Sequence, residues 1–252
     1  MAPRTILDDA TLDRATEEFR QQGFTALPRI FSRETIARAL EDVERILASD
    51  IVGSWNARFH YWKGAERIPE RIEPIVDLSD SIAGMCRDRN LTAVLTEILG
   101  DPPILLKDRV ILRPPGTDGY HVHQDYVFYP FCNPNRMVSV AIALDPTTPE
   151  NGALRFYPDR YCRSYTRWQP RFFSEAETAS LREAGPAIEI LQTPGEVILF
   201  HSLTPHESGE NQTTGFRRLI LLAYNALSEG DFYARHRKRY LTEIPDLGRR
   251  FQ

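Results

Sequence analysis

The stretch that decides the fold spans residues 121–125 and reads His121-Val122-His123-Gln124-Asp125. Side chains two positions apart on a β-strand lie on the same face of the sheet, so His123 and Asp125 can converge on one metal ion. His121 shares that face, whereas Gln124 points away from it. The stretch therefore predicts part of a metal site on an extended segment, and the remaining ligand has to come from elsewhere in the chain.

A second segment with suitable ligands follows about eighty residues later. Residues 194–201, Pro-Gly-Glu-Val-Ile-Leu-Phe-His, read as a turn and an apolar strand, and they lead to His201 and His206. Two histidines and one carboxylate on one side of a metal form the facial triad of non-heme iron(II) oxygenases, which leaves coordination positions open for a co-substrate and dioxygen. Geometry alone admits either of these histidines, and it also admits His121.

The residues around these two segments predict an antiparallel β-fold. From Ile104 onward, short apolar runs are separated by Pro, Gly and Asp residues. The expected strands cover residues 104–112, 119–125, 137–144, 153–156, 187–192, 196–201 and 217–224. Seven or eight short strands suit a double-stranded β-helix, the cupin-like jelly roll that commonly carries metal sites. We therefore expect a mainly β fold with a jelly-roll core at 104–225.

Residues 1–103 precede this core and are expected to be mainly helical. Amphipathic helices are predicted over 11–22, over 32–49 and over 90–99, with a short strand at 24–28. Thr11 and Asn90 are the expected N-caps, and Gly23 and Gly100 are the expected helix ends. The helices should pack on one sheet of the core, so that residues 1–252 form a single domain.

The connection from 157 to 186 is about thirty residues long, longer than most loops in compact domains. It is rich in aromatic residues, and Ser174 and Glu177 predict a short helix that begins with a capping box. One interpretation is a lid or substrate wall beside the metal, and the other is an ordinary packed insertion.

The composition argues against several classes of protein. A formal net charge of -4 gives no general basic surface for nucleic acid, and no apolar run is long enough to span a membrane. The N-terminus lacks the apolar core of a signal peptide, so we expect a cytoplasmic protein. The 3 cysteines have no CxxC spacing, which argues against a structural zinc site. A small molecule is the expected partner.

Several separate segments resemble the phytanoyl-CoA dioxygenase family of iron(II)- and 2-oxoglutarate-dependent oxygenases. They are His-Gln-Asp-Tyr at 123–126, Phe-Tyr-Pro-Phe at 128–131, Glu-Asn-Gly-Ala-Leu at 150–154, Pro-Gly-Glu-Val at 194–197, Pro-His-Glu-Ser-Gly-Glu-Asn at 205–211 and Arg-Arg at 217–218. The resemblance implies that His123, Asp125 and His206 bind iron, and it argues against His121 and His201 as ligands. It also implies that Arg217 binds the distal carboxylate of 2-oxoglutarate.

An arginine suits that carboxylate because its planar guanidinium can donate two parallel hydrogen bonds and stays charged. Ser208 is expected to add a hydroxyl donor. Lys107 is expected either to contact 2-oxoglutarate or a substrate carboxylate, or to lie on an exposed sheet face. The residues expected to line the substrate pocket are Tyr126, Phe128, Tyr129, Tyr157 and Trp168.

The activity that the resemblance implies is oxidation of a small-molecule metabolite with iron(II), 2-oxoglutarate and dioxygen. The product would be hydroxylated, cyclised or desaturated, with release of succinate and CO2. Two alternatives remain: a cupin-like metalloenzyme that does not use 2-oxoglutarate, and a catalytically silent protein that binds a small ligand. Arg217 argues against the first alternative, since such an enzyme needs no anchor for 2-oxoglutarate. The complete set of His123, Asp125, His206 and Arg217 argues against the second, since only metal binding would maintain it.

Overall fold

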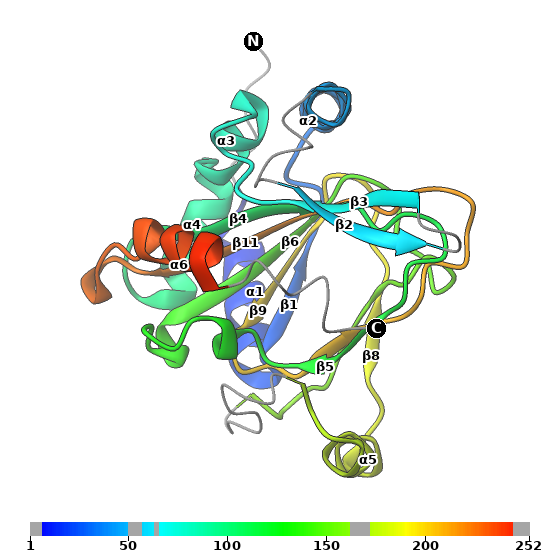
Figure 1. The fold of residues 1–252 in the computed structure, drawn as a ribbon. Helices are drawn as coiled ribbons and strands as arrows, with labels where there is room; N and C mark the ends of the chain where they lie inside the picture. The colour runs from blue at the N-terminus through cyan, green and yellow to red at the C-terminus, as the bar shows by residue number, and fades with distance from the viewer. Residues whose placement is uncertain (1–6, 50–56, 63–65, 162–171, 244–252) are drawn as a thin grey trace.

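Two antiparallel β-sheets pack face to face in the computed structural model, which describes residues 7–49, 57–62, 66–161 and 172–243 (Figure 1). The larger sheet has seven strands in the order β1-β9-β6-β11-β4-β3-β2, and the smaller has four in the order β5-β10-β7-β8. Helices cover one side of the larger sheet, and its other side faces the smaller sheet. This arrangement confirms the predicted jelly roll.

The strands of the larger sheet are β1 (Phe24–Leu27), β9 (Val197–His201), β6 (Met137–Ala143), β11 (Leu219–Ala226), β4 (Pro103–Ile111), β3 (Glu66–Ile72) and β2 (Ala57–Trp62). Those of the smaller sheet are β5 (Tyr120–His123), β10 (His206–Ser208), β7 (Leu154–Phe156) and β8 (Ile188–Ile190). Each predicted strand is found, with bounds shifted by a few residues, and the short β10 had not been predicted.

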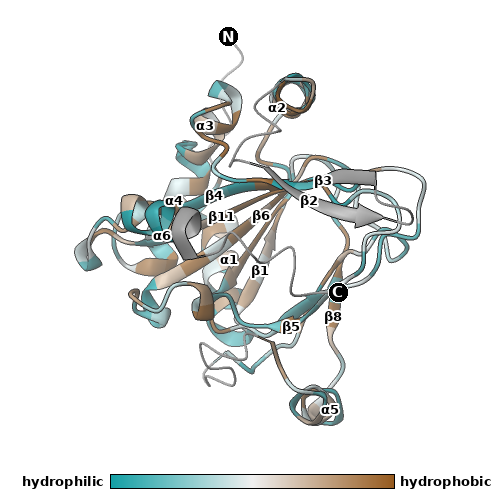
Figure 2. Cartoon of the chain, viewed as in Figure 1, coloured by the Kyte–Doolittle hydropathy of each residue, from teal (hydrophilic) through white to brown (hydrophobic). Residues whose placement is uncertain are grey.

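Strand β6 shows why the two faces of the larger sheet differ. Val138, Val140 and Ile142 point to one side, where they join a large apolar core with the helices. Ala141 and Ala143 point to the other side and pack against the smaller sheet. The helices on the first side are α1 (Asp9–Gln22), α2 (Arg33–Leu47), α3 (Asp80–Cys86) and α4 (Arg89–Leu99). Figure 2 shows apolar residues along the central strands β6 and β11, whose burial is the main stabilising term.

The ends of the helices follow the sequence, with two corrections at the N-caps. The caps of α1 and α4 are Asp8 and Asp88, not Thr11 and Asn90 as predicted. In each case the aspartate carboxylate accepts a hydrogen bond from the backbone N–H of the residue that had been predicted as the cap. A carboxylate at this position satisfies an otherwise unpaired donor of the first turn, so the acidic residue begins the helix.

The prediction that residues 1–103 are mainly helical is incomplete. Strands β2 and β3 form a hairpin that extends the larger sheet, with Arg71 of β3 paired opposite Ile111 of β4. Pro69 and a high density of charge obscure the strand pattern in this part of the sequence, because both are uncommon in strands. The jelly roll therefore recruits a charged strand from the N-terminal part of the chain.

Two further helices lie outside the core. The capping box at Ser174 and Glu177 begins α5 (Glu175–Ala184) as predicted. Residues 162–171 of the same connection are outside the described residues. Helix α6 (Tyr233–Glu243) follows the last strand and had not been predicted. Among the helices that the structure describes, none has both the length and the apolar character needed to span a bilayer.

Candidate metal centre

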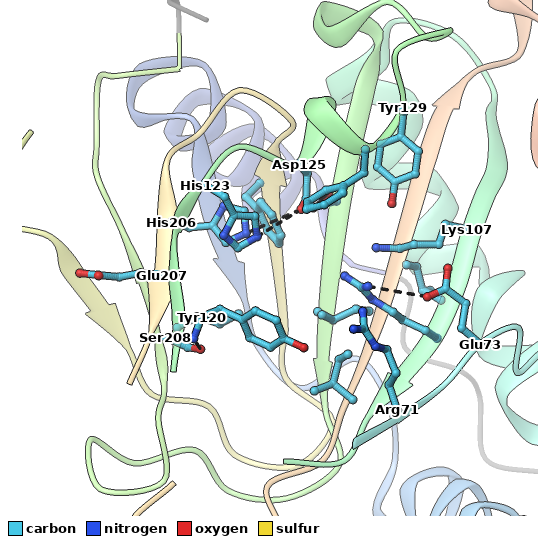
Figure 3. Close-up of a pocket in the computed structure, with 18 of the residues that line it drawn as sticks. Arg71, Glu73, Lys107, Tyr120, His123, Asp125, Tyr129, His206, Glu207 and Ser208 are labelled. Carbon is cyan, nitrogen blue, oxygen red and sulfur yellow. Dashed lines mark hydrogen bonds and ion pairs between the residues drawn. The ribbon is translucent and has the colours of Figure 1, made fainter. Parts of the chain in front are cut away.

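Pairing of two short strands brings the two key histidines together. His123 at the end of β5 lies directly opposite His206 at the start of β10, and their ring centroids are 4.2 Å apart. With Asp125 they form a buried group whose potential ligand atoms all lie within 4.8 Å of one another (Figure 3). The structure thus places the three residues that the sequence predicted as metal ligands within reach of one ion.

Asp125 reaches the site by a different route from the one predicted. Strand β5 ends at His123, and Asp125 begins a short 3-10 helix, Asp125–Phe128. Its Oδ1 atom lies 3.7 Å from His123 Nε2 and 3.8 Å from His206 Nε2. The turn replaces the expected strand because Tyr126 donates its backbone N–H to the carbonyl of Ser202. Asp125 therefore lies at the site as predicted, but on a 3-10 turn and not on a strand.

Hydrogen bonds to the backbone determine which nitrogen of each histidine is available. The Nδ1 atom of His123 is 2.8 Å from the carbonyl of His121, and the Nδ1 atom of His206 is 2.9 Å from the carbonyl of Thr204. A carbonyl only accepts, so each Nδ1 carries the proton and each Nε2 presents a lone pair to the site. The hydroxyl of Ser139 donates to Oδ2 of Asp125, which leaves Oδ1 facing the histidines.

The protonation states of the three side chains suit a metal. Burial, and after it the adjacent His206, lower the pKa of His123 to about 3. Burial lowers the pKa of His206 as well. Burial raises the pKa of Asp125, but its surroundings, His206 and Lys107 foremost, outweigh burial and hold that pKa below its usual range. Neutral imidazoles beside an ionised carboxylate are the donor set that fits iron(II).

The two competing histidines lie outside this group. The side chain of His121 is exposed and packs against the Phe172 ring with a centroid distance of 6.0 Å. His201 is buried in β9, where its Nδ1 accepts the backbone N–H of Leu203 at 3.1 Å. Its ring lies near that of Phe19 of α1. His201 therefore packs in the interior of the protein.

A cavity extends from the three residues to the larger sheet (Figure 3). Of the residues predicted around the site, it is lined by the three candidate ligands together with Lys107, Phe128, Tyr129 and Ser208. Tyr126 and Tyr157 do not line it. The hydroxyl of Tyr157 donates to Glu207 on the side of the smaller sheet that faces α5, away from the cavity. Trp168 lies outside the described residues.

Arg217 does not line the cavity directly either, and it precedes strand β11 instead of beginning it. Its buried guanidinium donates to the carbonyl of Gly152 at 2.7 Å. Within the described part of the chain, no carboxylate lies within 4.0 Å of it. Burial and the nearby Arg113 lower the pKa of Arg217 to about 9. The side chain of its neighbour Arg218 instead pairs with Asp145.

Several residues of the cavity were missed by sequence reasoning or left without a role. They are Arg71, Glu73, Arg109, Tyr120, Ser139, Phe172 and His236. Lys107, Arg109 and Ile111 are two apart on β4 and all line the cavity, so alternation could have found Arg109. Arg71 and Glu73 could not be found because β3 was not predicted.

Three basic side chains of the larger sheet line the cavity, and we call Arg71, Lys107 and Arg109 the basic wall. Figure 3 shows Arg71 and Lys107 across the cavity from the candidate ligands. Lys107 is 2% exposed, and its ammonium makes no hydrogen bond or ion pair with any described residue. It lies 5.8 Å from the centroid of the Tyr129 ring. Burial and the charge of Arg109 lower the pKa of Lys107 to about 8. An ammonium held in this way can bind an anion.

One carboxylate lies among these cations. Glu73 is 3.7 Å from Arg109 and 3.1 Å from Nε2 of His236, a residue of α6. Burial by itself raises the pKa of Glu73, but the hydrogen bond from His236 and the charge of Arg109 outweigh it and bring the pKa to about 2. The carboxylate is therefore ionised at neutral pH and offsets part of the positive charge.

Comparison with known proteins agrees with this geometry. The chain matches the model of the family described as phytanoyl-CoA dioxygenase (PhyH) over residues 19–219. It is 31% identical over 248 residues to a methylphosphonate hydroxylase of Gimesia maris, a match that covers 97% of this chain and 92% of that protein. It is 29% identical over 220 residues to a probable alpha-ketoglutarate-dependent hypophosphite dioxygenase of Stutzerimonas stutzeri, covering 83% and 77% of the two chains.

Among solved structures, EctD from S. alaskensis, crystallised with 2-oxoglutarate and 5-hydroxyectoine, has the same fold. The TM-score is 0.77 at 24% identity, and the match covers 89% of this chain and 80% of that one. The family match runs from the last turn of α1 to the first residue of β11. The chain therefore belongs to the phytanoyl-CoA dioxygenase family, and it is a dioxygenase that uses iron(II), 2-oxoglutarate and dioxygen.

Proposed function

We propose that this dioxygenase hydroxylates a small organophosphonate, and that the basic wall binds the phosphonate group. The observation that carries the proposal is the position of Arg71, Lys107 and Arg109, which line the same cavity as the metal ligands and face them from the opposite sheet. Guanidinium and ammonium groups are the usual partners of phosphorus oxyanions in proteins. Two of the relatives described above carry names that specify small phosphorus oxyanions.

In this proposal His123, Asp125 and His206 hold the iron. Iron(II), together with 2-oxoglutarate and dioxygen, supplies the oxidation that replaces a C–H hydrogen by a hydroxyl group and converts 2-oxoglutarate into succinate and CO2. The contribution of the chain is to fix the ligands. The backbone carbonyls that accept from each Nδ1 keep both Nε2 lone pairs aimed at the site, and Ser139 orients the carboxylate of Asp125.

We further propose that Arg217 and Ser208 bind the distal carboxylate of 2-oxoglutarate. Ser208 lines the cavity two residues after His206 on β10. Arg217 lies just before β11, and Gly152, which accepts its hydrogen bond, lies just before β7. These two strands contribute Leu221 and Leu154 to the cavity. These two leucines supply an apolar surface for the methylene groups of 2-oxoglutarate. A buried guanidinium without a carboxylate partner supports this role, since charge burial is costly until an anion pairs with it.

The remaining side of the cavity is left for the substrate. Ser208 lies on the smaller sheet beside His206, whereas Lys107 and Arg71 lie across the cavity on the larger sheet (Figure 3). Phe128, whose ring is 5.9 Å from that of His123, and Tyr129, whose ring is 5.8 Å from the ammonium of Lys107, line an aromatic surface suited to a short carbon chain. A phosphonate bound to the basic wall would therefore direct its carbon atom toward the metal.

The test measures succinate release with iron(II), 2-oxoglutarate and a panel of methylphosphonate, 2-aminoethylphosphonate, short carboxylates and an acyl-CoA thioester. We expect a phosphonate to raise succinate release above the substrate-free level and to give a new hydroxylated product by phosphorus NMR. Stimulation by the carboxylates or the thioester, with none by any phosphonate, would overturn the proposal.

A further inference from the structure

We propose that Thr204 is a positioning residue for the metal ligand His206, and that it acts by tying this ligand to the end of helix α1. Thr204 is fully buried in the connection between β9 and β10, two residues before His206. Its carbonyl accepts from His206, its hydroxyl donates to the carbonyl of Gly23, and its backbone N–H donates to the carbonyl of His201. The proposal concerns iron binding and holds whatever the substrate is.

The carbonyl of Thr204 needs such a hold because it lies outside the described strands, between the end of β9 and the start of β10. The carbonyl that accepts from the other histidine ligand belongs to His121, which lies within β5, where pairing with β10 fixes the backbone. A carbonyl partner fixes the tautomer and the ring orientation of a histidine ligand. A shift of the Thr204 carbonyl would therefore turn Nε2 of His206 away from the metal.

Gly23 at the C-terminal end of α1 is the fixed point of this connection. Its carbonyl accepts the Thr204 hydroxyl at 2.7 Å and the backbone N–H of His201 at 2.8 Å. The backbone N–H of Thr204 in turn donates to the carbonyl of His201 at 2.8 Å, which closes the turn. The segment that leads to His206 is therefore held on a helix end as well as by its two flanking strands.

Position 23 has no room for a side chain. Gly23 has a φ of +87°, and an added Cβ would lie 2.6 Å from the hydroxyl oxygen of Thr204 and 2.6 Å from a ring carbon of Tyr161. The close approach of Thr204 therefore requires glycine here, in addition to the helix-ending conformation that favours glycine. Gly100 ends α4 with a φ of +62° and gives a matched comparison, because an added Cβ there meets none of the described residues within 4 Å.

Packing of the ring is the alternative explanation for the position of His206. Its ring centroid lies 4.7 Å from that of Phe200 and 5.8 Å from that of Phe156. These contacts limit where the ring lies, but a phenyl edge does not determine which imidazole nitrogen carries the proton. The carbonyl of Thr204 determines it, and the hydroxyl of Thr204 keeps that carbonyl in place.

The experiment replaces Thr204 by valine, which keeps the branched shape and removes the hydroxyl. Iron(II) binding is measured by anaerobic titration, and the visible absorption of the complex with iron(II) and 2-oxoglutarate reports the coordination of the metal. We expect Thr204→Val to weaken iron(II) binding about tenfold and to change this absorption, since changes to outer partners of metal ligands typically cost about 10–100-fold in affinity. Thr204→Ser keeps the hydroxyl and should match the wild type in both measurements.

The control variant is Thr25→Val. Thr25 of β1 is equally buried, and its hydroxyl also connects the sheet to α1, by donating to Glu18 at 2.6 Å. This variant removes a comparable hydrogen bond outside the segment that leads to His206, so it should keep the iron affinity and the absorption of the wild type. If Thr204→Val fails to fold, Gly23→Ala and Gly100→Ala decide the test, because both replace a helix-ending glycine and only the first displaces Thr204.

We expect Gly23→Ala to weaken iron(II) binding and Gly100→Ala to leave it unchanged. Unchanged iron affinity and absorption in Thr204→Val would overturn the proposal, because ring packing would then suffice to hold His206. Equal weakening by Thr204→Val and Thr25→Val would also overturn it, since the effect would then follow from the loss of any hydrogen bond to α1. A loss in Thr204→Ser as large as that in Thr204→Val would overturn it as well, since the hydroxyl would then have no part in the effect.

Discussion

At the level of single residues, two hydrogen bonds decide what the histidines can bind. The carbonyls of His121 and Thr204 hold the Nδ1 protons of His123 and His206, so both Nε2 atoms are free of protons where they approach Asp125. The bond to His123 uses the backbone of His121 and not its side chain. The two histidines at 121 and 123 are therefore not equivalent, although they share a strand face in the sequence.

This difference predicts opposite results for two alanine variants. We expect His206→Ala to weaken iron binding at least about 100-fold, because loss of an outer partner of a ligand already costs 10–100-fold in other metal sites. His121→Ala keeps the carbonyl that orients His123 and should bind one iron per chain like the wild type. Iron stoichiometry after anaerobic reconstitution checks both. Loss of iron in the His121 variant would show that the ligand assignment is wrong.

Arg217 and Arg218 make a second matched pair. We expect Arg217→Met to raise the KM for 2-oxoglutarate at least about thirtyfold, since truncating one partner of a buried charged pair typically costs 2–5 kcal/mol. Arg218→Met removes the neighbouring guanidinium, which pairs with Asp145 on the other side, and should leave this KM unchanged. Equal effects of the two variants on the KM would contradict the role of Arg217.

Glu73 gives a prediction for the dependence of stability on pH. Its pKa in the folded protein is about 2, below that of an unfolded chain, so its ionised form stabilises the fold above the unfolded pKa. We expect Glu73→Gln to lower the free energy of unfolding at neutral pH by about 3 kcal/mol. The difference should shrink as the pH falls below about 4.5 toward the folded pKa. Urea unfolding of both proteins over this range measures it, and a difference that grows on acidification would contradict the assignment.

At the level of elements, the pairing of β5 with β10 builds the metal site. Gly119 precedes β5 at a close crossing, where an added Cβ would lie 2.3 Å from the carbonyl oxygen of Ser208. The two strands can therefore pair only if position 119 carries no side chain. This contact connects the start of β5 with the strand that carries His206 and Ser208.

The crossing predicts a loss of both stability and iron affinity in one variant. We expect Gly119→Ala to destabilise the fold by about 1–3 kcal/mol, as overpacking typically does, and to weaken iron binding by displacing β10. Gly215→Ala is the control, because an added Cβ there meets nothing within 4 Å. Urea unfolding and iron titration of the two variants check the prediction. A Gly119 variant as stable as the control would show that the crossing is less tight than described.

Sequence patterns predicted those helices and strands that are specified by residues close together in the sequence. Strand alternation and apolar spacing located most strands of the jelly roll and the three long helices, because each buries one regular face. Asp125 was identified as a candidate ligand, but its 3-10 turn depends on a backbone hydrogen bond to Ser202, a contact between distant segments. Strand β3 was missed because Pro69 and its charged residues obscure the strand pattern, and its pairing with β4 joins distant segments of the chain.

The direction of the predicted pocket side chains also depends on contacts between distant segments of the chain. Tyr157 is aromatic and near the site in sequence, yet it faces α5 because its hydroxyl finds Glu207 there. His236 was given no role, yet helix α6 carries it to Glu73, 163 residues away in the sequence. Ligand types and their spacing can be predicted from one sequence. The direction in which an isolated polar or aromatic side chain points depends on packing that no local pattern encodes.

At the level of the whole molecule, the two sheets have different tasks. The smaller sheet carries His123, His206 and Ser208, and the 3-10 turn that follows β5 carries Asp125. The larger sheet carries the basic wall. Segments outside the predicted core supply residues to the side of the cavity that we assign to the substrate: Arg71 from β3, Glu73 just after it, and His236 from α6. Oxidation and substrate recognition are therefore built by different parts of the chain.

The most direct test of this account follows both atoms of dioxygen. The wild-type protein is given iron(II), 2-oxoglutarate, methylphosphonate or 2-aminoethylphosphonate, and dioxygen labelled with a heavy oxygen isotope, and both products are analysed by mass spectrometry. We predict one labelled atom in succinate and one in the new hydroxyl group of the phosphonate, formed in equal amounts. Labelled succinate without any labelled phosphonate, or a yield of succinate that does not depend on the phosphonate, would contradict the account.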